Sequence, residues 1–399
     1  MKYILIFGIS LIFQITLFSQ RRFDLKIISE SRQREAIVSV PTTPPPAEGY
    51  PIVFMCHGTS GEATNYYNPV GWKELGQAEN FITIFPSALV WCYNDKRDDN
   101  KEKHLSKFVC GDLVDQVCEE DSNKLISDIL FFKKLIQLVS DTLKVNPKKI
   151  FMSGFSNGSS MAHKISMETT DVFSASGGSS ASLHSLDSTT PYPRRIPMLY
   201  MLGTKDDRYL SDLFPVELPF GGDSTLLYLQ VSIRRALICQ GLTEEFSKIE
   251  TPVSHIYTWN TCRSGETCAP YVFMLNKDQL HEFPNGQNHP VNAPKLLWNF
   301  FNNPPVVRMT TPVHELKQPD WDISFFPNPT SDYMYFKANG PISGPGQLKI
   351  INLSGEEMVQ YKVSTEGIRI MDIKSWPAGI YYAICSTKAG SKVKVLAKL

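Results

Sequence analysis

Short apolar runs recur between residues 30 and 303, and helical patterns separate several of them. Each run is bounded by glycine, proline or polar residues, which is typical of a β-strand. The runs are REAIVSV, PIVFMCHG, FITIFPS, KKIFMSG, FSASGG, IPMLYMLG, SHIYTW and YVFMLN. Several are apolar throughout, as in strands of a parallel sheet that is covered on both faces. The pattern therefore predicts the α/β class, with a mostly parallel sheet.

The longest helical pattern begins near Ser122. Its apolar positions recur three or four residues apart and would lie on one helical face. They are Leu125, Ile129, Phe132, Ile136, Val139 and Leu143. Asp121 or Ser122 is the expected cap at its start. Residues 95–107, by contrast, mix charges of both signs with few apolar side chains, and we expect a solvated loop there.

The two ends of the chain have different patterns. Residues 1–20 begin with a lysine and an apolar run, as a secretory signal peptide does, and the run is too short to favour stable membrane insertion. An uncleaved anchor is the alternative. Residues 304–320 are rich in proline and predict a linker. Residues 321–399 hold short alternating runs with turn signals and predict a small β-sandwich. Residues 21–303 are the expected main domain.

Composition narrows the classes of function. Lys and Arg number 40, as do Asp and Glu, and no basic face is apparent. A nucleic-acid partner or an anionic lipid surface is therefore not expected. The chain has no C-x-x-C pair and no H-E-x-x-H motif, so we expect no metal and no cofactor.

Export would expose the eight cysteines to an oxidising compartment. Cys56 lies inside an apolar strand and Cys385 stands alone in the last domain, so we expect both to be buried thiols. The other six are candidates for disulfides, and their pairing stays open. These six are Cys92, Cys110, Cys118, Cys239, Cys262 and Cys268.

The stretch GFSNGSS, between a predicted strand and a predicted helix, fits G-x-S-x-G with Gly154, Ser156 and Gly158. Glycines at these places allow a sharp turn, which lifts the serine hydroxyl towards the N-terminus of the helix. The sequence therefore predicts that Ser156 is a nucleophile on an elbow. The alternative is that Ser156 only caps the helix.

A serine nucleophile needs a base and a group that orients the base. Asp206 and Asp207 follow one apolar strand, and His281 follows a later one. This chain order, serine then aspartate then histidine, is that of α/β hydrolases. His289 is a rival in the same loop, but His281 follows its strand more directly. We expect His281 to be the base, and either aspartate could orient it.

The oxyanion of such a reaction needs backbone N–H donors, one of them from the residue after the nucleophile. Asn157 is that residue. The second donor is expected in the loop after an earlier strand. CHGT ends that strand with a His-Gly turn, and the backbone amide of Thr59 follows the turn. His57 itself is expected to be structural.

HGTSG, GFSNGSS, GTKDD and HEFPNG together resemble motifs of one family over residues 30–303. They are similar to the secreted esterases that include polyhydroxybutyrate depolymerases and feruloyl or acetylxylan esterases, which are α/β hydrolases. The resemblance implies that Ser156 is the nucleophile and His281 the base, and it selects Asp206 over Asp207.

Two residues depart from the family pattern. Ser159 stands where a second glycine is usual, and Phe283 stands where tryptophan is usual. Ser159 would crowd the start of the helix, and Phe283 would alter a substrate pocket. Both departures affect the expected substrate more than the expected activity.

The last domain resembles the C-terminal sorting domain of type IX secretion, through FFPNPTSDYMYF, PAGIYYAI and KVKVLAKL. The resemblance implies that secretion machinery is a partner and that the protein is secreted or held at the cell surface.

The sequence thus predicts a secreted serine esterase with a Ser-His-Asp acyl-enzyme mechanism. Its expected substrates are feruloyl or acetyl esters of polysaccharide, or a polyhydroxyalkanoate-type polyester, and the substrate could be polymeric. A secreted serine peptidase and a binding protein on a hydrolase scaffold without activity are the alternatives.

Overall fold

The computed structural model describes the chain in ten stretches. They are residues 20–96, 98–169, 171–181, 195–208, 227–309, 321–340, 346–352, 356–363, 368–387 and 390–399. The predicted signal peptide, apart from residue 20, and residues 310–320 of the predicted linker lie outside them. The chain divides into two compact units, residues 1–214 with 235–308, and residues 309–399 with 215–234. None of the helices described is long and apolar enough to cross a membrane.

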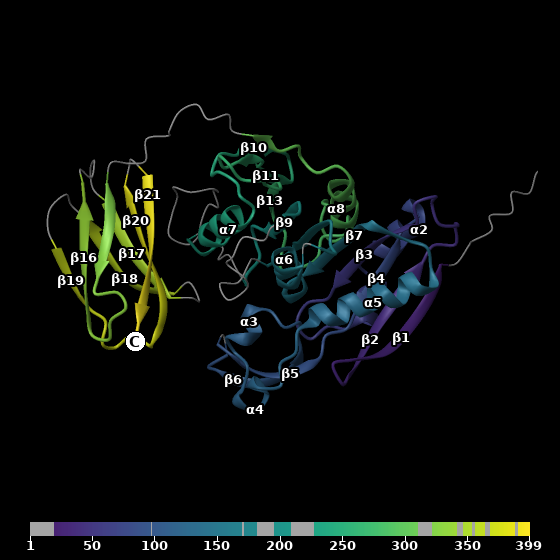
Figure 1. The fold of residues 1–399 in the computed structure, drawn as a ribbon, viewed down its shortest axis with the longest axis horizontal. Helices are drawn as coiled ribbons and strands as arrows, with labels where there is room; N and C mark the ends of the chain where they lie inside the picture. Colours follow the sequence, from purple (N-terminus) through teal and green to yellow (C-terminus); the bar gives the residue numbers. More distant parts are fainter. Residues whose placement is uncertain are drawn as a thin grey trace, which may run out of the picture. The chain divides into compact units, whose positions relative to one another are not determined.

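A ten-stranded sheet forms the centre of the first unit (Figure 1). Its strands, in sheet order, are β1 (Arg21–Ser29), β2 (Arg32–Val40), β4 (Ile82–Pro86), β3 (Tyr50–Cys56), β7 (Val145–Phe155), β8 (Ala175–Ser179), β9 (Met198–Gly203), β13 (Tyr271–Asn276), β11 (Ser254–Trp259) and β10 (Ser247–Glu250). The strands from β4 to β13 are parallel, and those at both edges are antiparallel. The predicted α/β class with a mostly parallel sheet is confirmed.

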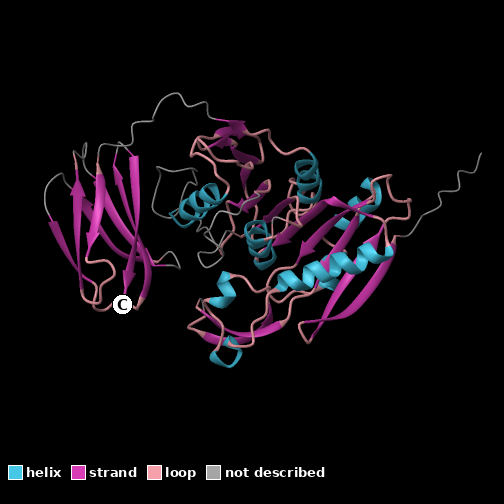
Figure 2. Cartoon of the chain, in the orientation of Figure 1, coloured by secondary structure: helices cyan, strands magenta, loops and turns pink. Residues whose placement is uncertain are grey.

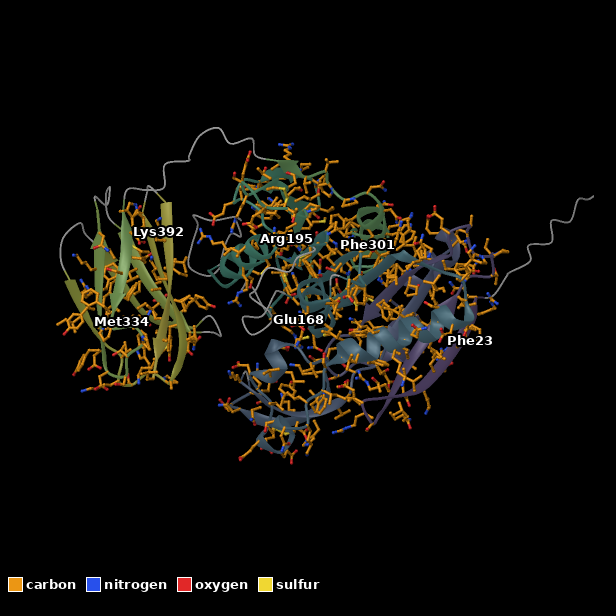
Figure 3. All side chains as sticks on the ribbon, viewed as in Figure 1. Phe23, Glu168, Arg195, Phe301, Met334 and Lys392 are labelled. Carbon is orange, nitrogen blue, oxygen red and sulfur yellow. A yellow bond between two sulfur atoms is a disulfide. The ribbon has the colours of Figure 1, made fainter. Side chains whose placement is uncertain are left out.

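Helices cover both faces of this sheet (Figure 2). The helices in the described part of the chain, not all of which lie on this sheet, are α1 (Ala63–Tyr67), α2 (Trp72–Glu79), α3 (Gly111–Val114), α4 (Glu119–Ser122), α5 (Asp128–Thr142), α6 (Asn157–Glu168), α7 (Leu227–Cys239) and α8 (Ala293–Asn302). Val53 and Met55 of β3 share an apolar cluster with α2 and α8, to which Phe301 also belongs (Figure 3). Phe54, between them, packs edge-on against Phe132 of α5. Alternate side chains of β3 therefore enter separate cores, which explains its unbroken apolar run.

The predicted start of the long helix is wrong. Helix α5 begins at Asp128, and the Ser127 side chain caps it by accepting the N–H of Ile129. Asp128 is buried on the core side because its Oδ1 accepts a hydrogen bond from Nη2 of Arg34 at 2.5 Å. The buried face of α5 therefore includes a carboxylate, which a search for apolar spacing treats as an exposed position.

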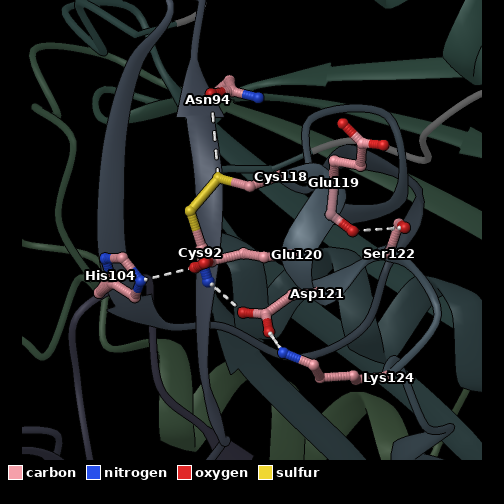
Figure 4. The surroundings of a disulfide bond; sticks show 9 residues. All are labelled: Cys92, Asn94, His104, Cys118, Glu119, Glu120, Asp121, Ser122 and Lys124. Atoms are coloured by element: carbon pink, nitrogen blue, oxygen red, sulfur yellow. Dashed lines mark hydrogen bonds and ion pairs between the residues drawn. A yellow bond between two sulfur atoms is a disulfide. The ribbon is translucent and has the colours of Figure 1, made fainter.

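Residues 95–107 are not a solvated loop as predicted. Strands β5 (Val90–Asp95) and β6 (Lys101–Ser106) pair there as an antiparallel hairpin. A disulfide between Cys92 and Cys118 joins this hairpin to the start of α4 (Figure 4). The apolar partners of β5 come from a separate small cluster around Trp91 and Leu113.

A second disulfide joins Cys262, in the short strand β12 (Thr261–Cys262), to Cys268. Cys110 and Cys239, also named as disulfide candidates, are buried thiols outside both disulfides, so that part of the prediction is wrong. Cys110 Sγ lies 3.7 Å from Met161 Sδ in the interior, where a small thiol packs as an apolar side chain does. Cys56 and Cys385 are buried thiols, as expected.

The second unit contains two antiparallel sheets after the short strand β14 (Arg308–Met309). One holds β15 (Asp322–Phe326), β16 (Tyr333–Asn339) and β19 (Ile368–Asp372). The other holds β18 (Glu357–Val363), β17 (Gly346–Asn352), β20 (Gly379–Thr387) and β21 (Gly390–Lys398). Trp321, Phe336, Leu348 and Leu396 are among the buried side chains of their shared core. The predicted small β-sandwich is confirmed.

Candidate active site

Ser156 occupies the sharp turn between β7 and α6. Its backbone has φ 50° and ψ −121°, a conformation that residues other than glycine rarely adopt. The Ser156 N–H donates a hydrogen bond to the carbonyl oxygen of Ser179 at 2.9 Å. The Ser156 side chain makes no capping bond to α6. The hydroxyl is therefore held at the turn without serving the helix.

The two glycines of the motif are required by close packing of the backbone. A Cβ at Gly154 would clash with the carbonyl of Gly158, and a Cβ at Gly158 would clash with the carbonyl of Cys56. The start of α6 thus lies directly on the end of β3. This packing brings the Ser156 turn beside the loop that begins at His57.

The side chains of Ser156, His281 and Asp206 form a continuous hydrogen-bonded series. His281 Nε2 lies 3.1 Å from Ser156 Oγ, and His281 Nδ1 lies 2.9 and 3.0 Å from the two carboxylate oxygens of Asp206. Asp206 is fully buried after β9, whereas Asp207 is exposed. Because the carboxylate accepts the Nδ1 proton, Nε2 can accept the proton of the serine.

Two other histidines have their ring nitrogens bonded to backbone. His289 Nδ1 accepts the N–H of Val291 and its Nε2 donates to the carbonyl of Lys277. His57 Nε2 accepts the N–H of Ala88, and its Nδ1 donates to Gly58. Burial lowers the pKa of His57 to about 4, so this ring is neutral. Neither ring can serve Ser156 as a base in this arrangement.

The two expected oxyanion donors lie on the two segments that meet at the elbow. Within the part of the chain that the structure describes, no acceptor takes a hydrogen bond from the N–H of Thr59 or of Asn157. The Asn157 side chain is occupied, because its Oδ1 accepts from the N–H of Phe108 and its Nδ2 donates to the Phe108 carbonyl. The neighbouring N–H of Gly58 donates to the hydroxyl of Tyr66. The backbone amides of Thr59 and Asn157 therefore stay the predicted donors.

An aromatic side chain that sequence reasoning missed stands beside the triad. The ring of Phe155 has its centroid 5.0 Å from that of His281 and 6.2 Å from that of Tyr66. Phe283, which was expected to alter a pocket, is instead buried in the apolar cluster under α8. The sequence feature that could have pointed to Phe155 is its position as the first x of the G-x-S-x-G motif, directly before Ser156.

Ser159, the departure from the glycine pattern, is accommodated by a glycine on the neighbouring strand. Its side chain is fully buried against Gly178 of β8, and a Cβ at Gly178 would clash with Ser159 Oγ. Because Gly178 has no side chain, there is room for the side chain of Ser159. The start of α6 is filled rather than crowded.

We expect Gly178→Ala to lower the free energy of unfolding by about 1–3 kcal/mol, since it overpacks a closed site. In a Ser159→Gly background the same change should cost less, with a coupling of at least about 0.5 kcal/mol. Some cost remains because the new Cβ also approaches the carbonyl of Gly154. Urea unfolding of the two single variants and the double variant measures this coupling, and simple additivity would contradict the contact.

Three residues of types that bind metals lie close together at the β5–β6 hairpin and the adjoining helix α4. Single ligand atoms of Cys92, His104 and Glu120 lie within 4.8 Å of one another. The sulfur of Cys92 is bonded to that of Cys118, and His104 Nε2 pairs with a Glu120 oxygen at 3.1 Å (Figure 4). This cluster therefore offers one imidazole and one carboxylate that already satisfy each other.

The strand order and the turn that carries Ser156 between a strand and a helix define the α/β-hydrolase fold. In the second unit, residues 324–398 match the family described as the secretion system C-terminal sorting domain. This match confirms the predicted sorting domain and indicates a secreted or cell-surface protein.

No curated protein sequence matches the chain. Solved structures with a similar fold include an acetyl xylan esterase from Aspergillus awamori, at 14% identity and a TM-score of 0.47 over 71% of this chain and 99% of that one. Another is an S-formylglutathione hydrolase from Staphylococcus aureus, at 11% identity and 0.41 over 71% and 100%. A third is a ferulic acid esterase from Anaeromyces mucronatus, at 11% and 0.40 over 73% and 92%. With these values, the fold assignment rests on strand order and the turn.

Proposed function

We propose that the protein is a secreted serine esterase, in which residues 21–303 hydrolyse carboxylic esters and residues 321–399 address the chain to secretion machinery. The observation that carries the proposal is the hydrogen-bonded series from Asp206 through His281 to Ser156. A serine hydroxyl becomes a useful nucleophile only with such a base and such an orienting group.

In the proposed mechanism, Nε2 of His281 takes the proton of Ser156 while the serine oxygen attacks the ester carbonyl. Asp206 holds the imidazole in the required tautomer and stabilises the imidazolium. The N–H groups of Thr59 and Asn157 stabilise the oxyanion. His281 then returns the proton to the leaving alcohol, and a water molecule, activated by the same ring, releases the acid from the acyl enzyme.

The proposed substrate class is narrower than esters in general. The motifs that resemble secreted polysaccharide esterases and polyester depolymerases favour feruloyl or acetyl groups on polysaccharide, or a polyhydroxyalkanoate-type polyester. Export is consistent with a polymer as the substrate, since a polymer outside the cell cannot be taken up before it is cut.

The test uses the purified full chain and five substrates: nitrophenyl acetate, methyl ferulate, acetylated xylan, polyhydroxybutyrate and a peptide anilide. We expect hydrolysis of at least one ester and no release from the anilide. Treatment with a fluorophosphonate, which reacts with activated serines, should remove the activity. Release from the anilide alone would support a peptidase instead. The absence of any hydrolysis would refute the proposal.

A further inference from the structure

Gln279 is a fully buried polar residue between β13 and His281. Its Oε1 accepts a hydrogen bond from Asn276 Nδ2 at 2.7 Å, and its Nε2 donates to Ser179 Oγ at 3.0 Å and to the carbonyl of Glu282 at 2.9 Å. Its own carbonyl accepts the N–H of Lys205 at 3.1 Å. A glutamine is rarely buried this completely, and here its side-chain and carbonyl groups are well matched.

Three of these partners, Ser179, Lys205 and Glu282, are bonded or adjacent in sequence to the three residues of the proposed triad. Ser179 accepts the N–H of Ser156 at its carbonyl, so it holds the nucleophile's backbone. Lys205 directly precedes Asp206, and Glu282 directly follows His281. Through three of its four hydrogen bonds, Gln279 therefore connects the nucleophile turn, the aspartate turn and the histidine loop.

The position of Gln279 is fixed from two further sides. A Cβ at Gly203, at the end of β9, would clash with the Gln279 carbonyl, so the histidine loop rests directly on that strand. Asn276, which donates to Gln279 Oε1, is held in turn by Ser254, whose Oγ donates to Asn276 Oδ1 at 2.6 Å. Ser254, Asn276 and Ser179 are all buried. The amide cannot shift without breaking a buried hydrogen bond.

We propose that Gln279 is a positioning residue, which sets the distances among Ser156, His281 and Asp206 without touching the reacting atoms. This inference rests on the proposed esterase function. A catalytic series works only when its members are held to within a fraction of an ångström, and a displacement of about 1 Å can lower the rate about a hundredfold.

Two substitutions separate the hydrogen bonds from the packing. Gln279→Glu keeps the shape, but replaces the Nε2 donor with an oxygen that faces the carbonyl of Glu282, which can only accept. Gln279→Leu removes every side-chain hydrogen bond and leaves Asn276 Nδ2 without its acceptor. Gln240→Leu is the matched control, because Gln240, directly after α7, is also buried and donates to the backbone carbonyl of Ile196.

The experiment measures kcat and KM for nitrophenyl acetate, the rate of Ser156 phosphonylation by a fluorophosphonate, and the melting temperature of each full-length variant. We expect both Gln279 variants to lose about tenfold to hundredfold in kcat and in phosphonylation rate, with KM changed less than about threefold. The Gln240 variant should lose stability while its kcat stays near that of the wild type.

The inference is overturned if folded Gln279 variants keep the wild-type kcat and phosphonylation rate, or if the Gln240 variant loses as much of both. If the Gln279 variants do not fold, Ser179→Ala removes only one of the bonds, and unchanged kcat in that variant overturns the inference as well. Failure of the wild type to cleave any ester would count against the proposed function. The phosphonylation rates would still decide the role of Gln279.

Discussion

Ser156→Ala is expected to abolish ester hydrolysis, with a fall in kcat of about 10⁵- to 10⁶-fold. The substitution removes the attacking oxygen and keeps the Cβ, so the turn at φ 50° and the hydrogen bond from its N–H to Ser179 can persist. The loss should therefore occur without unfolding. Initial rates on the ester that the wild type cleaves best measure it, with circular dichroism to establish that the variant is folded.

Ser160→Ala is the matched control, since Ser160 lies in the same serine-rich stretch on α6. Its kcat should stay within about threefold of wild type, because Ser160 is not one of the residues proposed to take part in the reaction. Intact mass after treatment with a fluorophosphonate gives a second readout. The wild type and Ser160→Ala should carry one adduct and Ser156→Ala none. An adduct on Ser156→Ala, or undiminished hydrolysis, would place the nucleophile elsewhere.

Asp206→Asn should lower kcat by about 10⁴-fold. Both carboxylate oxygens of Asp206 lie within 3.0 Å of His281 Nδ1. An asparagine in that place can turn its NH₂ group towards the ring, which favours the tautomer with its proton on Nε2. That nitrogen then cannot accept the proton of Ser156. The measurement is kcat at a pH where the wild type is most active.

The neighbouring aspartate supplies the comparison for this second prediction. Asp207→Asn removes the same charge one residue later, from an exposed position. Its effect on kcat should stay below about threefold, because a surface charge acts weakly through water. Equal losses in the two variants would mean that the charge of the turn, rather than the contact with His281, matters.

The fold could be predicted because its central strands are buried on both faces. PIVFMCHG and IPMLYMLG leave no polar face, and this pattern favours a covered parallel sheet over other arrangements. What the sequence did not reveal depends on partners far away in the chain. Asp128 is buried because Arg34, on β2, supplies its counter-charge and the N–H of Val109 donates to it. In the β5–β6 hairpin, three of the six residues on β6 are Lys or Glu.

The three residues of the proposed triad could be selected from the sequence because chain order and glycine spacing can be read directly from it. The positions of Ser156, His281 and Asp206 agree with that prediction in space, while their catalytic roles stay proposals. Gln279 could not be found in the same way. It lies in the polar segment NKDQLHE, which is typical of a surface loop. Its burial depends on Gly203, because the absence of a side chain there lets the loop that holds Gln279 pack directly against the end of β9.

The buried thiols make correct disulfide formation depend on whether the core packs before or after the cysteines are oxidised. Once the core has closed, burial raises the pKa of the Cys56 and Cys239 thiols and raises that of Cys385 to about 11, so little reactive thiolate forms. Before closure, all eight thiols compete for two bridges, and most pairings are wrong. An oxidant that acts after the apolar strands have packed finds fewer reactive thiols, so fewer cysteine pairings are possible. Collapse of the core before oxidation would therefore limit wrong pairing of the cysteines.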